Sequence, residues 1–448
     1  MRHIVIIGNG ISGVTCARNI RKQSNDKITI ISAESKYFYS RTALMYVYMG
    51  HMKFEHTQPY ENDFWEKNNI NLIHDFVNAI DTTNKSLQLK KTENLAYDKL
   101  VLALGSKSNM FGWPGQDLKG VQGLYNKQDL ELMELNTQGV KRAVIVGGGL
   151  IGVEMAEMLI SRGIAVTFLV REDRFWGNVL PKEDGKLIAD HMIKEHHVDL
   201  RFNCNLKAIL PDHAGVVRAV VVEETGEEIP CQFVGLTAGV SPNIDIVKGT
   251  DIKTDRGILV DEYLLTNIED VYAIGDCAQF VNPPKGRRAI EQVWYTGRMQ
   301  GEALAKTITG NPTKYEPGFW FNSAKFFDIE YQTYGTVLSE LQEGESNFYW
   351  QHARDNLALK MVFDAQTNLF KGINVFGLRM RHNMFDKWLR EGRTVDYIME
   401  HLADANFDPE LYKTYEVAIV EQYNKEQNKS IKPKSKSWKR ILQAITNG

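Results

Sequence analysis

Three glycines near the N-terminus have the spacing of a phosphate-binding turn. A short apolar stretch leads into Gly8, Gly10 and Gly13, and a helical pattern follows. Gly8 permits a tight turn, Gly10 lets backbone N–H groups approach a pyrophosphate, and Gly13 lets the helix pack closely on the strand. A second apolar stretch, residues 27–32, precedes Glu34, whose carboxylate can accept hydrogen bonds from an adenosine ribose. This order predicts a dinucleotide site; a chance glycine turn is the alternative.

The same pattern occurs a second time. Residues 143–146 lead into Gly147, Gly149 and Gly152, and another apolar stretch follows at residues 165–170. One such fingerprint is compatible with many enzymes. Two in one chain imply two dinucleotides, and the natural reason for two is electron transfer between them.

The second fingerprint ends without an acid. Val170 occupies the acid position, and Arg171 and Arg174 follow it. A carboxylate there would bind a ribose 2′-OH and repel a 2′-phosphate, whereas a guanidinium can bind phosphate with two hydrogen bonds. The pattern favours NADPH over NADH. The alternative is that both arginines are solvated, since Glu172 and Asp173 beside them partly cancel their charge.

Length and composition set limits on the other possibilities. A chain of 448 residues favours two or three domains of about 100–200 residues. The net charge of −3 gives no overall basic field for nucleic acid. The first apolar run is too short for a secretory segment, and no stretch approaches the roughly 20 apolar residues of a membrane-spanning helix. A cytoplasmic location is expected.

The cysteines predict no redox or metal centre. Cys16, Cys204, Cys231 and Cys277 are far apart and form no C-x-x-C pair. A disulfide framework or a zinc site is therefore not expected. Small buried apolar side chains are their predicted role.

Four further stretches carry a resemblance to a known family. They are F-Y-S-R-T-A-L around Arg41, Y-D-K-L-V-L-A-L-G-S around Ala103 and Gly105, T-N-I-E-D-V-Y-A-I-G-D ending at Gly275 and Asp276, and the aromatic stretch from residue 319 around Trp320. The chain resembles the two-dinucleotide-binding-domain FAD/NAD(P)-dependent oxidoreductases, the pyridine nucleotide-disulfide oxidoreductase superfamily. Within it the chain is similar to the ferredoxin-, rubredoxin- and nitrite-reductase-type NAD(P)H reductases.

The resemblance implies roles for particular residues. Arg41 would lie against the flavin nucleotide, and Asp276 would hold the ribityl hydroxyls of FAD. Glu154 would hold the nicotinamide carboxamide over the flavin. Trp294 lies in a helix whose N-terminus would point at the flavin, where it stabilises the negative charge of the reduced form. Trp320 belongs to an interface domain whose aromatic residues lie near the flavin ring.

The chain also departs from the family pattern. Leu104 replaces the threonine of the A-T-G hinge, and Tyr46 stands where many ferredoxin-type reductases have a lysine. Disulfide-type members carry a cysteine near residues 41–44, or a paired motif in the first helix, and this chain has only Cys16 there. Cysteine-based disulfide or peroxide reduction is therefore not expected.

The expected fold is α/β, with two Rossmann-like dinucleotide-binding domains, one inserted in the other, and an α+β C-terminal interface domain. The predicted boundaries are 1–111 and 244–313 for the FAD-binding domain, 112–243 for the NAD(P)-binding domain, 314–424 for the interface domain and 425–448 for a basic tail. Residues 356–363 and 369–376 predict a hairpin, and residues 384–389 and 394–402 predict helices.

Two basic segments are candidates for partner contacts. One is a cluster formed by Arg379, Arg381, Lys387, Arg390 and Arg393. The other is the tail, which is expected to be a disordered lysine-rich segment followed by a short amphipathic helix at residues 437–445. The tail could dock an acidic protein or a membrane surface, and the alternative is that its helix folds back on its own domain or on a second subunit. The arginine and lysine cluster could steer an acidic ferredoxin-like carrier, and a solvated helix face explains it equally well.

The expected activity is an FAD-dependent oxidoreductase that takes hydride from NADPH or NADH and passes electrons to a small iron–sulfur carrier such as ferredoxin or rubredoxin. Two alternatives stay open: an NAD(P)H oxidase or quinone reductase, and a redox-sensing flavoprotein scaffold. A nucleic-acid partner is not expected, and a homodimer is compatible with the sequence.

Overall fold

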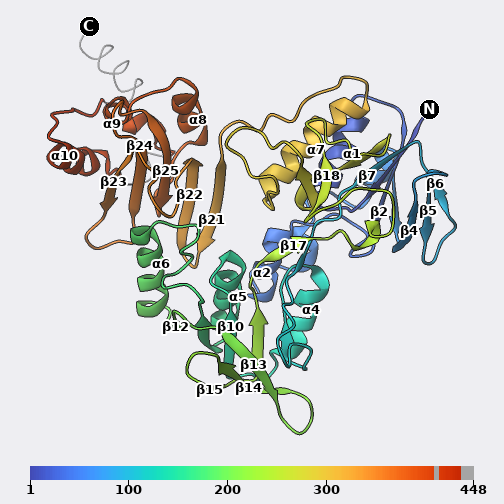
Figure 1. Cartoon of the computed structure of the whole chain (residues 1–448), viewed down its shortest axis with the longest axis horizontal. Coiled ribbons are helices and arrows are strands. Elements are labelled where there is room, and N and C mark those ends of the chain that lie inside the picture. Colours follow the sequence, from blue (N-terminus) through green and yellow to red (C-terminus); the bar gives the residue numbers. More distant parts are fainter. Residues whose placement is uncertain (408–412, 435–448) are drawn as a thin grey trace. The chain divides into compact units, whose positions relative to one another are not determined.

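The computed structural model describes residues 1–407 and 413–434 (Figure 1). These residues form two compact units. Unit 1 contains residues 1–171 and 204–317, and unit 2 contains residues 172–203 and the chain from residue 318 onward. Each unit is described by itself.

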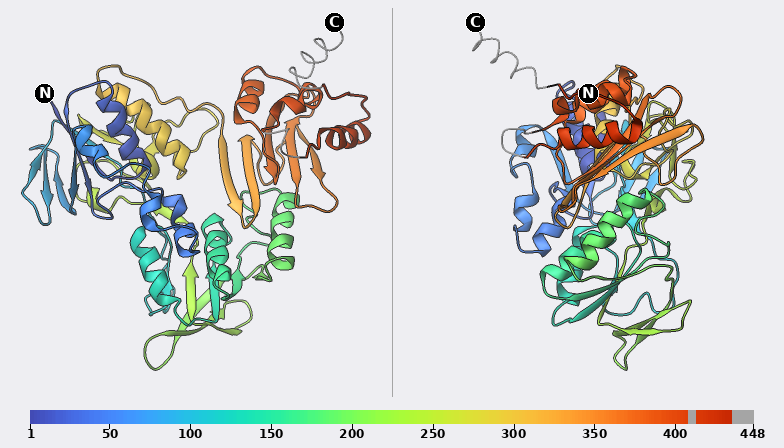
Figure 2. Two further views of the ribbon diagram at one scale, coloured as in Figure 1. Left: turned by 180° about the vertical axis from the view of Figure 1, so that it is seen from behind. Right: turned by 90° about the vertical axis from the view of Figure 1, so that its left-hand side faces the viewer.

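The first sheet of unit 1 is entirely parallel, in the order β19-β7-β1-β2-β3. Its strands are β1 (His3–Ile7), β2 (Lys27–Ser32), β3 (Ile70–His74), β7 (Lys99–Leu102) and β19 (Val271–Ala273). Their side chains are mostly buried and β-branched, as expected of a parallel sheet covered on both faces. Helices α1 (Ile11–Arg21) and α7 (Trp294–Ile308) lie side by side against it (Figures 1 and 2).

A second parallel sheet lies between β7 and β19 in the sequence. Its strands in unit 1 are β9 (Val121–Gln122), β10 (Arg142–Val146), β11 (Ala165–Leu169) and β16 (Phe233–Leu236), in the order β11-β10-β16-β9. Helices α4 (Lys127–Asn136) and α5 (Leu150–Ser161) belong to the same part of the chain. Because β19 returns to the first sheet after the second is complete, one Rossmann-like domain is inserted in the other, and the predicted fold is confirmed.

Shorter elements complete unit 1. Two antiparallel three-stranded sheets are formed by β4 (Val77–Asp81), β5 (Ser86–Leu89) and β6 (Leu95–Ala96), and by β13 (Leu206–Pro211), β14 (Val217–Val222) and β15 (Glu228–Pro230). Two strand pairs are β8 (Ser106–Ser108) with β17 (Val240–Pro242), and β18 (Ile258–Val260) with β20 (Ala278–Phe280). The short helices are η1 (Arg41–Ala43), α2 (Leu44–Tyr48), η2 (Phe54–Thr57), α3 (Phe64–Lys67), η3 (Asp245–Val247) and η4 (Gly275–Cys277).

Unit 2 is built on an antiparallel sheet in the order β21-β22-β25-β24-β23. The strands are β21 (Phe321–Phe326), β22 (Ile329–Gly335), β23 (Glu345–Gln351), β24 (Ala358–Asp364) and β25 (Phe370–Phe376). The helices are α6 (Lys182–Lys194), α8 (His382–Arg390), α9 (Val395–Glu400), η5 (Leu402–Ala405) and α10 (Glu416–Gln427), and β12 (Asp199–Arg201) follows α6. Apolar residues of the sheet and of α8, α9 and α10 form one core. The predicted hairpin and both predicted helices are confirmed.

Helix α6 contacts the sheet of unit 2 through polar side chains. Glu183 Oε2 lies 2.7 Å from Lys360 Nζ, and Asp184 Oδ2 accepts a hydrogen bond from Asn374 at 2.8 Å. The domain boundaries predicted from the sequence place this helix in the NAD(P)-binding domain. In the structure, residues 172–203 belong instead to the same compact unit as the C-terminal sheet. The difference arises because these contacts join residues that are far apart in the sequence.

The described part of the basic tail is ordered by ion pairs. Lys425 lies in the last turn of α10, Lys429 pairs with Asp396 at 2.8 Å, and Lys434 pairs with Glu400 at 2.8 Å. The expectation of a disordered lysine-rich segment is therefore wrong up to residue 434. The helix predicted at residues 437–445 lies outside the described residues.

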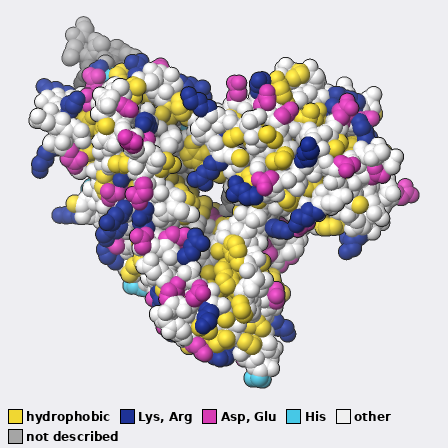
Figure 3. Space-filling view, in the orientation of Figure 1, with side chains coloured by type: hydrophobic (Ala, Val, Ile, Leu, Met, Phe, Trp, Pro, Cys, Tyr) yellow, Lys and Arg dark blue, Asp and Glu magenta, His cyan; other side chains and the backbone are white. Residues whose placement is uncertain are grey.

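The predicted basic cluster is largely neutralised within unit 2. Its ion pairs are Arg379–Glu330 at 2.6 Å, Arg390–Asp386 at 2.7 Å, Arg393–Glu391 at 2.8 Å and Lys387–Glu391 at 3.8 Å. Positive and negative side chains are also interspersed over the face drawn in Figure 3. Within residues 1–407 and 413–434, no helix has the length and apolar character that crossing a membrane requires.

Candidate active site at two glycine turns

The first glycine turn leaves room at the start of a helix. Gly8 has φ +112°, and a Cβ there would lie 2.1 Å from the carbonyl oxygen of Ala103. A Cβ on Gly13 would lie 2.1 Å from the carbonyl oxygen of Gly8, so both positions need glycine. Gly10 is the N-cap of α1, no side chain caps the helix, and no atom lies within 4 Å of where its Cβ would be. Uncapped N–H groups facing open space suit a pyrophosphate.

The second turn repeats this geometry. Gly147 has φ +116°, and a Cβ on Gly152 would lie 2.5 Å from the carbonyl oxygen of Gly147. Gly149 is the N-cap of α5, again without a side-chain cap and with no atom within 4 Å of a Cβ. Both turns therefore fit the phosphates of a dinucleotide.

A cavity of about 750 Å³ extends from the first turn. Among the residues that line it are these predicted site residues: Gly8, Gly10, Glu34, Arg41, Ala103, Gly105, Glu154, Asp276 and Trp294. Gly13 packs behind the turn and Gly275 precedes Asp276. Gly147, Gly149, Gly152 and Arg171 belong to the second turn and its following strand and do not line this cavity. Trp320 lies in unit 2, where its carbonyl oxygen accepts a hydrogen bond from Gly335 N at 2.8 Å.

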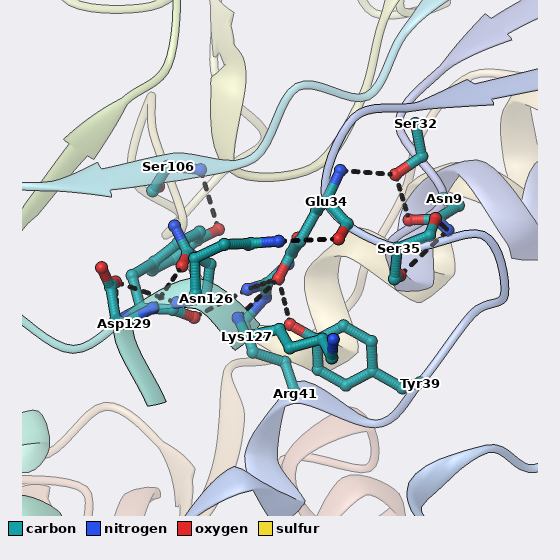
Figure 4. Close-up of polar contacts among 12 residues, drawn as sticks. Asn9, Ser32, Glu34, Ser35, Tyr39, Arg41, Ser106, Asn126, Lys127 and Asp129 are labelled. Carbon is teal, nitrogen blue, oxygen red and sulfur yellow. Dashed lines mark hydrogen bonds and ion pairs between the residues drawn. The ribbon is translucent and has the colours of Figure 1, made fainter. Parts of the chain in front are cut away.

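Glu34 lies at the centre of a polar cluster (Figure 4). Its Oε1 accepts hydrogen bonds from the Tyr39 hydroxyl, from Arg41 Nη1 at 3.0 Å and from the Lys127 backbone N–H at 3.0 Å. Its Oε2 accepts from Arg41 Nη2 at 2.6 Å. Burial would raise the pKa of Glu34, but Arg41 and the other donors hold this pKa below its ordinary value. A negative carboxylate with accepting capacity left on Oε2 fits the predicted ribose contact.

Asp276 is held by residues from two other segments. Its Oδ2 accepts from Ser106 Oγ at 3.0 Å and lies 3.3 Å from the Tyr125 hydroxyl. Burial raises the pKa of Asp276, and these two hydrogen bonds oppose the rise only in part. A buried carboxylate on the cavity wall needs further donors, and hydroxyl groups of a ligand can supply them.

Two residues of this site were missed by sequence reasoning. Tyr125 lies under the Arg41 guanidinium, 4.5 Å from Cζ to the ring centroid, and its carbonyl oxygen accepts from Arg41 Nη1 at 2.7 Å. Asn9 is buried, accepts from Ser32 Oγ at 2.9 Å and donates to the Ser35 carbonyl at 2.8 Å. Asn9 stands inside the glycine motif, which was a usable signal, whereas nothing in the sequence around Tyr125 indicated its role.

Glu154 differs from Glu34 because its pKa is shifted in the opposite direction. It lies in the second turn of α5 and lines the cavity. Burial, and then repulsion by Glu157, raise the pKa of Glu154 to about 7. The side chain can therefore exist in both protonation states near neutral pH.

Helix α7 begins at the cavity wall. No side chain caps its N-terminus, and Trp294, its first residue, lines the cavity. The preceding loop is braced by a buried ion pair in which Arg287 Nη2 lies 2.6 Å from Glu291 Oε2. Thr296 donates to the same carboxylate at 3.1 Å. The brace fixes the helix end, whose positive dipole favours negative charge in the cavity.

The cysteines are single and mostly buried. All four are free thiols, and none lines the cavity among the described residues. Burial raises the pKa of Cys16, and it raises those of Cys231 and Cys277 to about 12. Cys277 Sγ accepts from the Leu104 N–H at 3.4 Å, so the leucine that replaces the hinge threonine still fixes this turn through its backbone. Buried thiols of high pKa are poor nucleophiles.

The two predicted arginines of the second nucleotide turn have different surroundings. Arg171 follows β11 in unit 1. Arg174 lies in unit 2, where Nη2 contacts Glu340 Oε1 at 2.5 Å and the Gly177 carbonyl at 3.2 Å. A phosphate would have to compete with Glu340 for Arg174, so the prediction of a 2′-phosphate contact depends on Arg171.

Comparisons with known proteins agree with this geometry. The chain is 27% identical to the nitrite reductase [NAD(P)H] of Bacillus subtilis over 96% of the chain and 50% of that protein, so it spans half of its length. It is 30% identical to the 5,5'-dehydrodivanillate O-demethylase ferredoxin reductase subunit of a Sphingobium strain, over 75% of the chain and 82% of that protein. The crystal structure of NADH:rubredoxin oxidoreductase from Clostridium acetobutylicum matches with a TM-score of 0.69 and 25% identity, over 88% of this chain and 96% of the other.

A family model describing pyridine nucleotide-disulphide oxidoreductases matches residues 2–301, which contain both glycine turns, Glu154 and Asp276. Its range covers more than half of the 448 residues. Chains of this family use FAD and NAD(P)H, which are the two dinucleotides that the sequence predicts. The chain belongs to the pyridine nucleotide-disulphide oxidoreductase family.

Proposed function

We propose that this chain is an FAD-containing NAD(P)H reductase that passes electrons to a small protein carrier of the ferredoxin or rubredoxin type, without a thiol pair. The observation that carries the proposal is Glu154. It comes from the helix that begins at the second glycine turn, and it lines the cavity that begins at the first. The similar proteins include a ferredoxin reductase subunit, a rubredoxin oxidoreductase and a nitrite reductase, and they support the same class of enzyme.

Different groups of the protein bind different parts of the two dinucleotides. The N–H groups after Gly10 hold one pyrophosphate and those after Gly149 hold the other. Glu34 and Arg41 fix the adenosine end of FAD, and Asp276 accepts hydrogen bonds from its ribityl hydroxyls. When bound, FAD accepts two electrons from a nicotinamide and can release them one at a time.

The remaining groups position the nicotinamide and tune the site. Glu154 accepts a hydrogen bond from the carboxamide and so sets the orientation of the ring. The N-terminus of α7 favours negative charge at the cavity wall beside Trp294. No acid or base is required from the protein for hydride transfer itself.

Arg171 tests which nucleotide is used. We expect Arg171→Ala to raise KM for NADPH about tenfold or more, because a charged hydrogen bond to phosphate contributes roughly 1.5–3 kcal/mol. KM for NADH should change little. Arg174→Ala is the matched control, and it should leave the NADPH-to-NADH ratio unchanged because Glu340 already binds that side chain. A wild-type protein that uses NADH alone would refute the NADPH preference.

The acceptor is tested by anaerobic stopped-flow spectroscopy. Protein reduced by NADH or NADPH is mixed separately with a ferredoxin, a rubredoxin, a quinone and oxygen. The proposal predicts that one protein carrier reoxidises the flavin at least about tenfold faster than oxygen does. Faster reoxidation by oxygen or quinone would favour the oxidase alternative, and a flavin that stays reduced with every acceptor would favour the sensing scaffold. The cytoplasmic location, a homodimer and membrane contact through the tail stay predictions.

A further inference from the structure

Three side chains that could bind a metal ion converge in unit 2, and none of them lines the cavity described above. His191 Nε2 lies 2.5 Å from Asp328 Oδ1, His196 Nε2 lies 3.1 Å from His191 Nε2, and His196 Nε2 lies 3.4 Å from Asp328 Oδ1. Helix α6 and the residues after it supply both imidazoles, and the turn between β21 and β22 supplies the carboxylate. Each side chain offers one possible ligand atom, and these three atoms all lie within 4.8 Å of one another.

The spacing of these atoms suits a metal ion. Zinc binds imidazole nitrogen and carboxylate oxygen at about 2.0–2.2 Å in a tetrahedral arrangement, which separates neighbouring ligand atoms by roughly 3.3–3.5 Å. Two of the three separations are already close to this value. The third, between His191 and Asp328, requires an opening of about 1 Å. The Asp328 side chain is 73% exposed and is therefore free to move that far.

The two imidazoles are held in place by their neighbours. His191 is buried, and its Nδ1 lies 2.9 Å from the side-chain amide nitrogen of Asn356. The His196 ring stacks on Phe327, with centroids 4.0 Å apart and planes 21° apart. Phe327 has φ +56° in a two-residue turn, an uncommon conformation for a bulky residue. The turn thereby places the aromatic ring beneath His196 and the carboxylate of the next residue beside His191.

We propose that His191, His196 and Asp328 bind a divalent transition-metal ion of the zinc class and so fasten α6 to the β21–β22 hairpin. Two imidazoles and one carboxylate are ligands that zinc commonly takes, and the exposed side of Asp328 leaves a position for water. With Nε2 on the metal, His191 Nδ1 carries a proton, which Asn356 accepts when its amide is turned by 180°. Bound metal would raise the free energy of unfolding of unit 2 by RT ln(1 + [metal]/Kd).

A purely proton-linked cluster is the competing explanation. In that case His191 donates to Asp328 and no ion is involved. The two explanations differ in stoichiometric metal binding, which requires all three side chains at once. They also differ in the effect of Asn356→Ala, which should weaken metal binding about 10- to 100-fold by removing the orienting partner of His191.

The test uses the full-length flavoprotein, freed of metal by a chelator that is then removed. Isothermal titration with ZnCl₂ should give one site per chain, and Zn²⁺ should raise the thermal midpoint of the wild type. His196→Gln and Asp328→Asn should each raise the Zn²⁺ dissociation constant at least about tenfold and remove the thermal shift. Bound FAD per chain, measured for every variant, reports whether unit 1 is intact.

His213→Gln is the matched control, because His213 is an exposed histidine of unit 1. It should bind Zn²⁺ as the wild type does. Absence of stoichiometric Zn²⁺ binding in the wild type would overturn the proposal, as would wild-type affinity in either ligand variant. These results do not depend on the reductase assay, so failure of the metal site and failure of the proposed function can be told apart.

Discussion

At the residue scale, two carboxyl groups of the cavity have pKa values that are shifted in opposite directions. Glu34 is paired with Arg41, and its pKa stays below the ordinary value. Glu154 has burial and Glu157 acting in the same direction, which places its pKa at about 7. The first suits a fixed negative charge that organises the nucleotide end of the site. The second suits a group whose hydrogen bonding to a ligand changes near neutral pH.

Glu154 should give the proposed nucleotide binding a pH dependence. Above pH 7 the side chain is a carboxylate, which accepts a carboxamide hydrogen bond more strongly than the neutral acid does. KM for NAD(P)H should therefore fall as pH rises from about 6 to 8. Glu154→Gln should raise KM and make it independent of pH over this window, as measured by steady-state kinetics with a saturating acceptor.

Glu157→Gln is the control for this assignment. It removes the repulsion that helps to raise the pKa of Glu154, so the midpoint should move to lower pH while the dependence persists. A wild-type KM that is constant from pH 6 to 8, or a dependence that survives in Glu154→Gln, would contradict the role given to Glu154.

At the element scale, each nucleotide turn contains glycines of two kinds. One kind is required by close packing, and the other borders open space. In the second turn, a Cβ on Gly152 would lie 2.5 Å from the Gly147 carbonyl oxygen and 2.6 Å from the Phe168 ring. A Cβ on Gly149 would meet no atom within 4 Å. A side chain at position 152 would overfill the contact between helix and strand, whereas a side chain at position 149 would enter the space assigned to a pyrophosphate.

This difference predicts separate effects for two matched variants. Gly152→Ala should lower the free energy of unfolding by about 1–3 kcal/mol through overpacking, as measured by urea unfolding. Gly149→Ala should leave that free energy within about 1 kcal/mol, because its φ of −102° suits alanine. It should instead weaken NAD(P)H binding at least about tenfold. Equal loss of stability in both variants would contradict the assignment of open space to Gly149.

The contact between α6 and the sheet of unit 2 should make stability depend on pH. Asp184 is fully buried, and burial raises its pKa to about 7. Between about pH 4 and pH 7 the folded chain holds a proton that the unfolded chain releases. The free energy of unfolding should therefore fall as pH rises through this window, by at most about 4 kcal/mol.

Asp184→Asn should flatten this part of the stability profile, measured by denaturant unfolding at several pH values. Asp364→Asn is the control, because Asp364 is a surface carboxylate of the same unit whose pKa is lowered by the hydrogen bonds of its turn. That control should keep the wild-type slope. A slope that is unchanged in Asp184→Asn would show that another group is responsible.

At the scale of the whole molecule, local patterns predicted the elements, and long-range contacts were not predictable. The glycine motifs placed β1, β2, β10 and β11 within a residue or two, because a turn, a strand and a helix start are fixed by neighbours in the sequence. Three side-chain pairs join residues that lie 33 to 190 positions apart in the sequence, and no local pattern encodes such pairs. They are Tyr125 with Asp276, Asp184 with Asn374, and Lys429 with Asp396.

The absence of a disulfide among the four cysteines bears directly on the proposed chemistry. A family named for disulphide chemistry is represented here by four single thiols, three of them buried. Because the four cysteines form no disulfide, we assign two-electron storage in the proposed reductase to FAD. The number of electrons that the protein accepts therefore distinguishes this account from disulfide chemistry.

The most direct test is an anaerobic titration of the purified flavoprotein with NADPH and, separately, with NADH, followed by the flavin absorbance. We predict complete bleaching at one equivalent of nucleotide per FAD, with the same endpoint after the accessible thiols have been alkylated. An endpoint at two equivalents, or one that alkylation halves, would show that a thiol pair takes part. A flavin that neither nucleotide reduces would contradict the reductase itself.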